Sequence, residues 1–432
     1  MHALYVGGGH VLRPDGTIVE GDVLVDRDAG RIDAVGTDVP VPADAETLDA
    51  AGGLVIPGLV NAHTHVAMTL LRGYADDKPL DAWLKEDVWP VEAELEPADV
   101  AAGTRLGVAE MIRSGTTAFA DMYFEMDQVA DVVAESGMRA RLGHGAITVG
   151  KDADAAHADF ETALAFAREY DGAADGRLTT MLTPHSLTTV DETYFREYVP
   201  QARDAGIPVH VHANETTDEV EPIVSESGQR PLAYADDLDV LAPDSFLAHC
   251  VHVDAGEIDL LAERGTAVVH CPASNMKLAS GMAPVQAMLD AGVTVGLGTD
   301  GAASNNDLDM FDELRDAAML GKLAADDASA VDAQAAVEMA TVGGAAAIGI
   351  DSGRIEPGAN ADLAVVDLEV PHLTPRHDLV SHLAYAARGS DVRHTVCDGE
   401  VLMRDREVLT VDVDAARAAA QERATALVER AA

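Results

Sequence analysis

The sequence is short of positive charge and of aromatic residues. Its 432 residues include 29 Lys plus Arg against 75 Asp plus Glu, a formal charge of −46, and only 4% are aromatic. Nucleic acids and anionic membranes are bound by clustered Lys and Arg, so this deficit excludes both as partners. The composition is nevertheless 48% hydrophobic, and the acidic residues are spread along the chain. We therefore expect a folded protein with an acidic surface rather than a disordered polyanion.

Lysine is especially rare. It occurs only at Lys78, Lys85, Lys151, Lys277 and Lys322. An alanine-rich, lysine-poor and acidic composition resembles that of proteins from salt-loving organisms. Molar salt shortens the Debye length to about 3 Å and screens the repulsion among surface carboxylates. The sequence therefore predicts a halophilic protein whose stability rises with salt.

Cysteine and long apolar runs are also scarce. The three cysteines, Cys250, Cys271 and Cys397, have no CxxC spacing and are too few for a disulfide framework, which is typical of a reducing compartment. The uncharged stretch over residues 50–71 is interrupted by proline, asparagine and histidine, so we do not expect it to span a membrane. Residues 1–14 have neither a basic leader nor a long apolar run. We predict a cytoplasmic protein.

Short strand-like runs occur near both ends of the chain. They are separated by Gly and Asp turns and cover residues 3–6, 22–25, 31–35, 361–367, 392–397 and 400–404. The pair Asp398-Gly399 indicates a hairpin between the last two runs. We predict that residues 1–56 and 361–432 form one discontinuous β-sandwich domain, with a terminal helix over residues 414–432.

The middle of the chain, residues 57–360, alternates apolar runs with longer Ala-rich stretches of helical character. The apolar runs cover residues 54–65, 116–122, 139–143, 178–183, 207–213, 245–251, 266–271 and 293–299. Eight repeated βα units predict an α/β fold of the (β/α)8 TIM-barrel type. Active-site residues of such barrels lie at the C-terminal ends of the strands.

Histidines and one aspartate at these strand ends predict a metal site. His63 and His65 are two residues apart on the first strand, so their imidazoles lie on the same face. The fifth strand carries His210 and His212, of which His212 lies nearer the strand end. Asp300 ends the eighth strand, where a buried carboxylate needs a partner or a metal. A ligand set suited to Zn²⁺, or to Fe²⁺, with one position left for water, is therefore His63, His65, His212 and Asp300.

The fourth strand offers no bridging ligand for a second metal. Two-metal sites on such barrels generally need a carboxylated lysine or a glutamate there, and residues 178–186 contain neither. The sequence therefore predicts one divalent metal per chain.

Several separated motifs occur in order along the chain. They are PGLVNAHTH at 57–65, LLRGYADD at 70–77, WPVE at 89–92, PHS at 184–186, HANE at 212–215, LAHCVH at 247–252, CPASNMKL at 271–278 and GTDG at 298–301. These motifs resemble those of the amidohydrolase superfamily, and within it those of the 5′-methylthioadenosine/S-adenosylhomocysteine deaminases. The resemblance implies a metal-dependent deaminase that converts such adenosines to the inosine derivative and ammonia.

The resemblance also implies a role for individual residues. Glu215 would protonate ring N1, His249 would hold the attacking oxygen, and Asp300, besides binding metal, would accept a proton from the attacking water. Glu92 would accept hydrogen bonds from the ribose hydroxyls. The substrate-binding residues would be Glu92, His185, Glu215 and Asp300.

One position departs from the family pattern. Several relatives carry Arg near the position of His144, where it reaches the substrate, so the preferred 5′ substituent stays open. Three histidines are expected to pack or to support other residues, namely His210, His252 and His270. Three further residues either line the mouth of the site or form an ordinary turn, namely Ser274, Asn275 and Lys277.

Two other functions fit the same residues. Another amidohydrolase, such as a guanine or cytosine deaminase or a triazine hydrolase, would use the same metal and acid on a different electron-poor ring. A non-catalytic scaffold would keep the barrel without turnover, but it would have no need of Glu215 and His249. The expected partner is a small adenine nucleoside. Members of the superfamily are often homo-oligomers, although no segment here indicates a symmetry.

Overall fold

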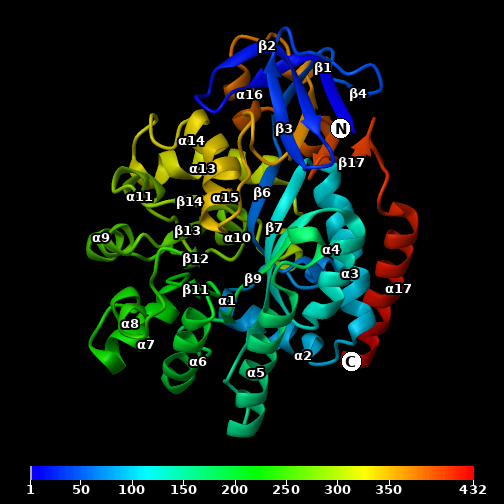
Figure 1. Ribbon diagram of the computed structural model, residues 1–432. Helices are drawn as coiled ribbons and strands as arrows, with labels where there is room; N and C mark the ends of the chain where they lie inside the picture. Colours follow the sequence, from blue (N-terminus) through cyan, green and yellow to red (C-terminus); the bar gives the residue numbers. More distant parts are fainter. Residues whose placement is uncertain (1) are drawn as a thin grey trace.

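The computed structural model describes residues 2–432 and contains two parallel sheets and one larger sheet (Figure 1). The first parallel sheet comprises β6 (Leu59–Thr64), β7 (Thr116–Tyr123), β8 (Arg139–Ala146), β9 (Leu178–Thr180) and β10 (Thr183–Pro184). The second comprises β11 (His210–Ala213), β12 (Phe246–His249), β13 (Ala267–His270) and β14 (Val295–Leu297). Each of the eight apolar runs predicted as a strand overlaps at least one of these nine strands.

The two parallel sheets meet along two seams. At one seam, the isolated parallel bridges Leu182 to Val209 and Ser186 to His212 connect the region of β10 with β11. At the other, β14 lies beside β6, and the Asp300 N–H donates to the His63 carbonyl at 3.0 Å. Within residues 2–432 no strand pair joins β14 to β6, so the strands form two sheets of an α/β fold and not one closed sheet.

Helices cover the outside of the parallel strands (Figure 1). Those between the strands and after them are α3 (Pro97–Arg113), α4 (Met126–Ser136), α5 (Ala153–Tyr170), α6 (Glu192–Asp204), α7 (Thr217–Ser227), α8 (Pro231–Asp237), α9 (Ala255–Arg264), α10 (Pro272–Lys277), α11 (Val285–Asp290), α12 (Ala302–Asn305), α13 (Met310–Ala325), α14 (Ala333–Glu338), α15 (Gly344–Ala347) and α16 (Leu379–Tyr385). Between β6 and α3 lie η1 (Val66–Leu71), α1 (Leu80–Ala82), the π-helix η2 (Trp83–Val88) and α2 (Trp89–Glu92). No helix within residues 2–432 has both the length and the apolar character needed to cross a membrane.

The two ends of the chain share the third sheet, as predicted. Its strands are β1 (Ala3–Leu12), β2 (Ile18–Asp26), β3 (Arg31–Gly36), β4 (Glu46–Asp49), β5 (Gly53–Pro57), β15 (Leu363–Asp367), β16 (Val392–Cys397), β17 (Glu400–Arg404) and β18 (Glu407–Val408). The ends join where β15 pairs antiparallel with β5, and one apolar cluster contains Leu4 and Val25 from one end with Leu363 and Val396 from the other. All nine strands form a single sheet, so the two-layered sandwich stays a prediction.

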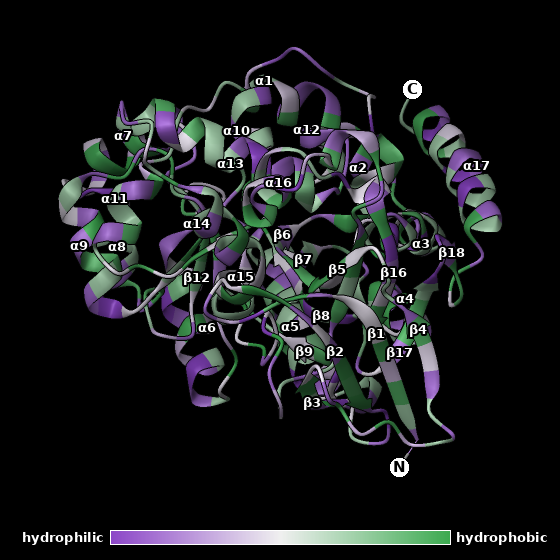
Figure 2. Ribbon diagram, turned by 90° about the horizontal axis from the view of Figure 1, so that it is seen from above, coloured by the Kyte–Doolittle hydropathy of each residue, from purple (hydrophilic) through white to green (hydrophobic). Residues whose placement is uncertain are grey.

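The terminal helix α17 (Val413–Ala431) closely matches its predicted range and packs along α3 (Figure 1). Hydrophobic and hydrophilic residues alternate along it (Figure 2). Leu427 is fully buried, and Arg430 forms an ion pair with Asp99, a fully buried acid of α3. This contact attaches the C-terminal helix to the parallel-strand region rather than to the end sheet.

Candidate active site

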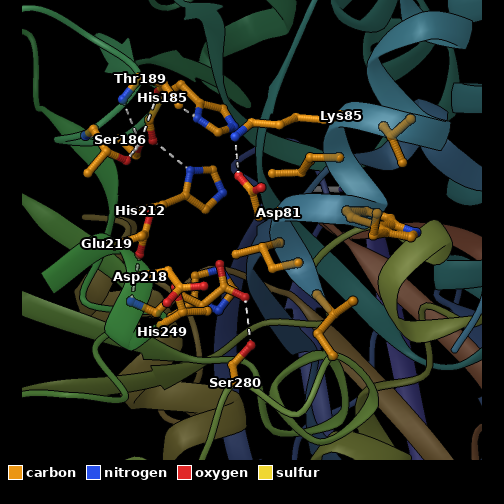
Figure 3. A pocket seen from close by; sticks show the side chains of 18 of the residues that line it. Asp81, Lys85, His185, Ser186, Thr189, His212, Asp218, Glu219, His249 and Ser280 are labelled. Atoms are coloured by element: carbon orange, nitrogen blue, oxygen red, sulfur yellow. Dashed lines mark hydrogen bonds and ion pairs between the residues drawn. The ribbon is translucent and has the colours of Figure 1, made fainter. Parts of the chain in front are cut away.

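A cavity of about 670 Å³ opens where the parallel strands end. Its inner end is lined by histidines and carboxylates, and Figure 3 shows His185, His212 and His249 on one side with Asp81 and Lys85 directed toward it from the other. Strand ends meet here because parallel strands run in the same direction, so the residues that follow each strand converge. Every residue predicted for the site either lines this cavity or, in the case of His63, lies directly beneath it.

Four side chains at the inner end form a metal-ligand group. The ligand atoms of His63, His212, His249 and Asp300 lie within 4.8 Å of one another. His65 is outside this group of four but contacts two of its members, because its Nε2 lies 3.1 Å from Asp300 Oδ1 and 3.3 Å from His212 Nε2. The structure therefore brings together all four predicted ligands and adds His249 as a neighbour.

Backbone carbonyls orient two of these imidazoles. His65 Nδ1 donates to the Met122 carbonyl at 2.6 Å, and His212 Nδ1 donates to the His185 carbonyl at 2.6 Å. A neutral imidazole that donates through Nδ1 carries its lone pair on Nε2. Burial lowers the pKa of His65, but Asp300 outweighs it and raises that pKa to about 9. In the neutral form of both residues, which a metal selects, the Nε2 lone pairs face the centre of the group.

His63 is oriented by a second histidine. His210 Nδ1 lies 2.8 Å from the Phe246 carbonyl and must donate to it, so His210 Nε2 is an acceptor. His63 Nδ1, at 2.8 Å from that nitrogen, is then the donor. His63 Nε2 is buried and has no hydrogen-bond partner, which is the condition of a nitrogen prepared to bind a cation. His210 thus orients His63, one of the two roles, packing or support, that were expected of it.

The carboxylate of Asp300 completes the donor set. Its Oδ2 accepts hydrogen bonds from Ser274 Oγ and Ser304 Oγ, both at 2.7 Å, which leaves Oδ1 directed at the histidines. Burial raises the pKa of Asp300, but the imidazoles of His63 and His65 outweigh it and hold that pKa well below its usual range. Neutral imidazoles with one ionised carboxylate are the donors that divalent transition metals such as Zn²⁺ prefer. The residues present therefore fit a divalent metal.

Glu215 and His249 stand beside the ligand group. Glu215 Oε2 lies 3.7 Å from His249 Nε2, while its Oε1 accepts a hydrogen bond from Ser280 Oγ at 3.0 Å. Burial raises the pKa of Glu215, against the opposing effect of His249. His249 Nδ1 donates to Asn275 Oδ1 at 3.0 Å, which points its Nε2 toward Glu215 and the ligands. A buried acid with a raised pKa beside a metal group is suited to move protons.

Glu219, on α7, is a functional candidate that the sequence prediction missed. It lines the cavity, and its Oε2 accepts a hydrogen bond from the backbone N–H of Glu215 at 2.9 Å. Burial and the nearby Glu215 carboxylate raise the pKa of Glu219 to about 7. Its position four residues after Glu215 was visible in the sequence, but one further acid among 75 carries little information by itself.

Glu92 ends α2 on the opposite wall of the cavity. Its Oε1 accepts a hydrogen bond from the Tyr123 hydroxyl at 2.7 Å, and burial raises the pKa of Glu92 to about 7. Tyr123, at the end of β7, was not predicted as a site residue. Its hydroxyl holds one carboxylate oxygen of Glu92 and leaves the other for a ligand.

His185 follows β10 and lines the cavity, as predicted. Its Nδ1 lies 2.9 Å from Thr189 Oγ1, and its ring centroid lies 4.7 Å from that of His212. Burial lowers the pKa of His185 to about 3, so its imidazole is neutral.

His144 does not line the cavity. Its Nε2 lies 3.1 Å from Asp159 Oδ1, a carboxylate that also binds Lys151 at 2.6 Å. The imidazole is held by this acid and takes no part in lining the cavity. The preferred 5′ substituent stays open, as it was in the sequence.

The residues whose roles were left open divide into two groups. Ser274 and Asn275 support the site through their hydrogen bonds to Asp300 and His249. Lys277 instead pairs with Asp76 at 2.6 Å and does not line the cavity. His252 does line it, while both ring nitrogens of buried His270 have no hydrogen-bond partner.

Known proteins resemble this chain over nearly its whole length. A 5-methylthioadenosine/S-adenosylhomocysteine deaminase of Halobacterium salinarum is 70% identical over 428 residues, 99% of each chain. Among solved structures, an adenosine deaminase from Xanthomonas campestris with bound zinc has a TM-score of 0.93 at 40% identity, covering 99% of this chain and 98% of that one.

More distant structures share the fold alone. An atrazine chlorohydrolase from Arthrobacter aurescens complexed with zinc has a TM-score of 0.89 at 24% identity, covering 98% of this chain and 100% of that one. The sequence of the present chain also matches the model of the amidohydrolase family over residues 54–402. Since this match spans far more than half of the chain, the protein belongs to the amidohydrolase family.

Proposed function

We propose that this protein is a metal-dependent hydrolytic deaminase of 5′-substituted adenosines, with 5′-methylthioadenosine and S-adenosylhomocysteine as its substrates. The relative that is 70% identical carries this name. The observation that carries the proposal is that one cavity holds the hydrolytic groups at its inner end and a carboxylate suited to a ribose, Glu92, on its wall.

We propose that one divalent metal is held by His63, His65, His212 and Asp300, with Zn²⁺ as the first candidate and Fe²⁺ as the second. The inward-facing Nε2 atoms and the partnerless His63 Nε2 support this assignment. When bound, such a metal lowers the pKa of a coordinated water to about 7 and so supplies a nucleophile at neutral pH. The absence of lysine and glutamate from residues 178–186 supports a single metal.

The residues of this chain would then act on water and on the adenine ring. Asp300 accepts a proton from the attacking water as its oxygen forms a bond to ring C6. Glu215 delivers a proton to ring N1, so that the ring can take up the electron pair. Burial lowers the pKa of His249, but the Glu215 and Asp300 carboxylates outweigh it and raise that pKa. The protonated imidazole donates a hydrogen bond through Nε2 to the attacking oxygen and stabilises the tetrahedral intermediate. Asp300 then passes its proton to the 6-amino group, the C6–N6 bond breaks and ammonia leaves. The hydroxyl proton at C6 passes to Glu215, so the inosine derivative remains and both carboxyl groups return to their starting states.

The substrate would be oriented from the opposite wall. The oxygen of Glu92 that is free of Tyr123 accepts hydrogen bonds from the ribose hydroxyls. The neutral imidazole of His185 contacts the substrate near His212. Fixing the nucleoside at its ribose places C6 at the inner end of the cavity, where the hydrolytic residues lie.

We also propose a division of the chain into working parts. Residues 57–360 act as a (β/α)8 barrel that carries the site, and residues 1–56 and 361–432 form a separate β domain with a terminal helix. The two seams between the parallel sheets support the first part, and the pairing of β5 with β15 supports the second.

Ammonia release from a panel of compounds tests the function. We expect 5′-substituted adenosines to be deaminated with a higher kcat/KM than guanine, cytosine, free adenine or chlorinated and aminated triazines. A preference for free bases or triazines would favour another amidohydrolase activity. No turnover of any compound by protein loaded with metal would favour a binding scaffold.

A further inference from the structure

The cavity wall that leads away from Glu92 is one helical run, Leu80 to Glu92. Its residues that line the cavity include Asp81, Trp83, Leu84, Lys85, Val88, Trp89 and Glu92. At about 1.5 Å per residue, the seven steps along the chain from Lys85 to Glu92 correspond to roughly 10 Å. A ribose extended by a thioether side chain of four bonds spans a comparable length, because each bond of about 1.5 Å advances the chain by a little over 1 Å.

The far end of this run carries an ion pair. Lys85 Nζ lies 2.5 Å from Asp81 Oδ1, and the two side chains are 58% and 63% exposed. Figure 3 shows both of them directed toward the cavity. Among the residues that line the cavity, Lys85 is the only Lys or Arg. One of the five lysines of an extremely acidic chain therefore stands at the mouth of its active site.

The stretch between the ion pair and Glu92 is apolar. Leu84, Val88 and Trp89 line it, and Ile147 and Leu278 are further apolar residues of the cavity lining. A thioether sulfur packs favourably against aromatic rings such as that of Trp89. Along the wall from Glu92, apolar residues come first and the ion pair comes last. A 5′ substituent that begins with a thioether and ends in charged groups matches this order.

We infer that the Asp81–Lys85 pair recognises the α-amino-acid end of a 5′ substituent such as that of S-adenosylhomocysteine, an inference that rests on the proposed function. The carboxylate of the substituent binds the Lys85 ammonium, and its ammonium binds the Asp81 carboxylate. Each charge of the zwitterion meets an opposite charge, so no net charge is added to a cavity that already holds Glu92, Glu215 and Glu219. A 5′-methylthio group ends within the apolar stretch and does not reach the pair.

The same geometry disfavours 5′ substituents with net negative charge. A 5′-phosphate would place its charge near Glu92 and short of Lys85, in a cavity whose other charged side chains are acidic. Unpaired like charges at close range oppose binding. Adenosine 5′-monophosphate is therefore expected to be a poor substrate.

Comparing kcat/KM for two substrates tests the inference. In Lys85→Met and Asp81→Asn, we expect the value for S-adenosylhomocysteine to fall about threefold to tenfold, as for partly exposed charge-assisted contacts. The value for 5′-methylthioadenosine should fall by less than about twofold on the same reasoning. Lys78→Met is the matched control, because Lys78 lies in the same segment but pairs with Glu86 and Asp87 and does not line the cavity.

A third substrate separates the two contacts. The adenosylhomocysteine analogue that keeps the ammonium but lacks the carboxylate should respond to Asp81→Asn and not to Lys85→Met. Equal losses for both natural substrates in the two variants, or no loss for S-adenosylhomocysteine, would overturn the inference. Failure of the unaltered enzyme to deaminate 5′-methylthioadenosine would instead overturn the proposed function, so the two failures are distinct.

Discussion

The inner and outer ends of the cavity are built in different ways. At the inner end, strand-end histidines are fixed by backbone carbonyls, as His65 is by Met122 and His212 by His185, and they are largely buried. At the outer end, the short helices α1 and α2 flank the π-helix η2, and the side chains of the Asp81–Lys85 ion pair are more than half exposed. With buried, hydrogen-bonded groups where we propose that bonds break and exposed groups where we propose that the substituent lies, such a site can keep one chemistry while its substrate preference changes.

The largest effect is expected from removing a metal ligand at the inner end. His65→Ala or Asp300→Ala should abolish metal binding and lower kcat/KM by more than about a thousandfold, because both the nucleophile and the charge stabilisation are lost. Metal analysis of the purified variants, together with ammonia release, measures both. His249→Ala serves as the control for ligation: it should keep the metal while losing turnover. If His249→Ala lost the metal and His65→Ala retained it, the ligand set would be wrong.

The second-largest effect is expected from replacing Glu215, the proposed proton-transfer residue. Glu215→Gln should keep the metal, since Glu215 is not a proposed ligand, but lower kcat about a hundredfold to ten-thousandfold because an amide cannot relay a proton. Single-turnover ammonia release with metal-loaded protein measures this. Near-normal turnover of Glu215→Gln would refute the acid/base role.

A smaller effect on kcat/KM is expected from replacing Glu92 on the cavity wall. Glu92→Ala should lower kcat/KM for a ribonucleoside about tenfold to a few hundredfold, the equivalent of losing charge-assisted hydrogen bonds. A 2′,3′-dideoxy analogue cannot make those bonds and should be nearly unaffected, so the comparison of the two substrates is the measurement. Equal losses for both substrates would mean that Glu92 does not bind the ribose.

The smallest effect is on stability and follows from the raised pKa of Glu92. Because burial raises this pKa from 4.5 to about 7, the folded protein favours the protonated acid. The wild type should therefore lose stability relative to Glu92→Gln as pH rises from 4.5 to about 7, and the difference should stay constant above that. We expect a difference of about 1 to 3 kcal/mol. Chemical unfolding of both proteins at pH 5 and pH 8 measures it, and a difference independent of pH would contradict the burial of an acid here.

The comparison of the inner and outer ends of the cavity also explains which parts of the site could be predicted from the sequence. The inner end was predictable because period-two spacing places His63 and His65 on one face and because strand ends converge. The supporting contacts were not, since the relay from Phe246 through His210 to His63 depends on how strands distant in sequence pack together. The eight strands were found from their apolar runs, whereas the division into two parallel sheets depends on pairing at the seams.

Little of the outer end of the cavity could be predicted from the sequence. Nothing in residues 80–92 signals a π-helix, and Lys85, which lines the cavity, lies within that π-helix. Tyr123 and Glu219 were missed because a tyrosine in an apolar strand and an acid among 75 have no distinguishing spacing. Salt-dependent stability, expected from the charge of −46, stays a prediction.

The most direct test of a one-metal hydrolytic centre is the metal content of active wild-type protein. We expect one equivalent of divalent metal per chain, complete loss of adenosine-deaminating activity after chelation, and recovery that is linear in added metal and saturates at one equivalent. Two equivalents per active chain, or full activity in exhaustively chelated protein, would contradict the account.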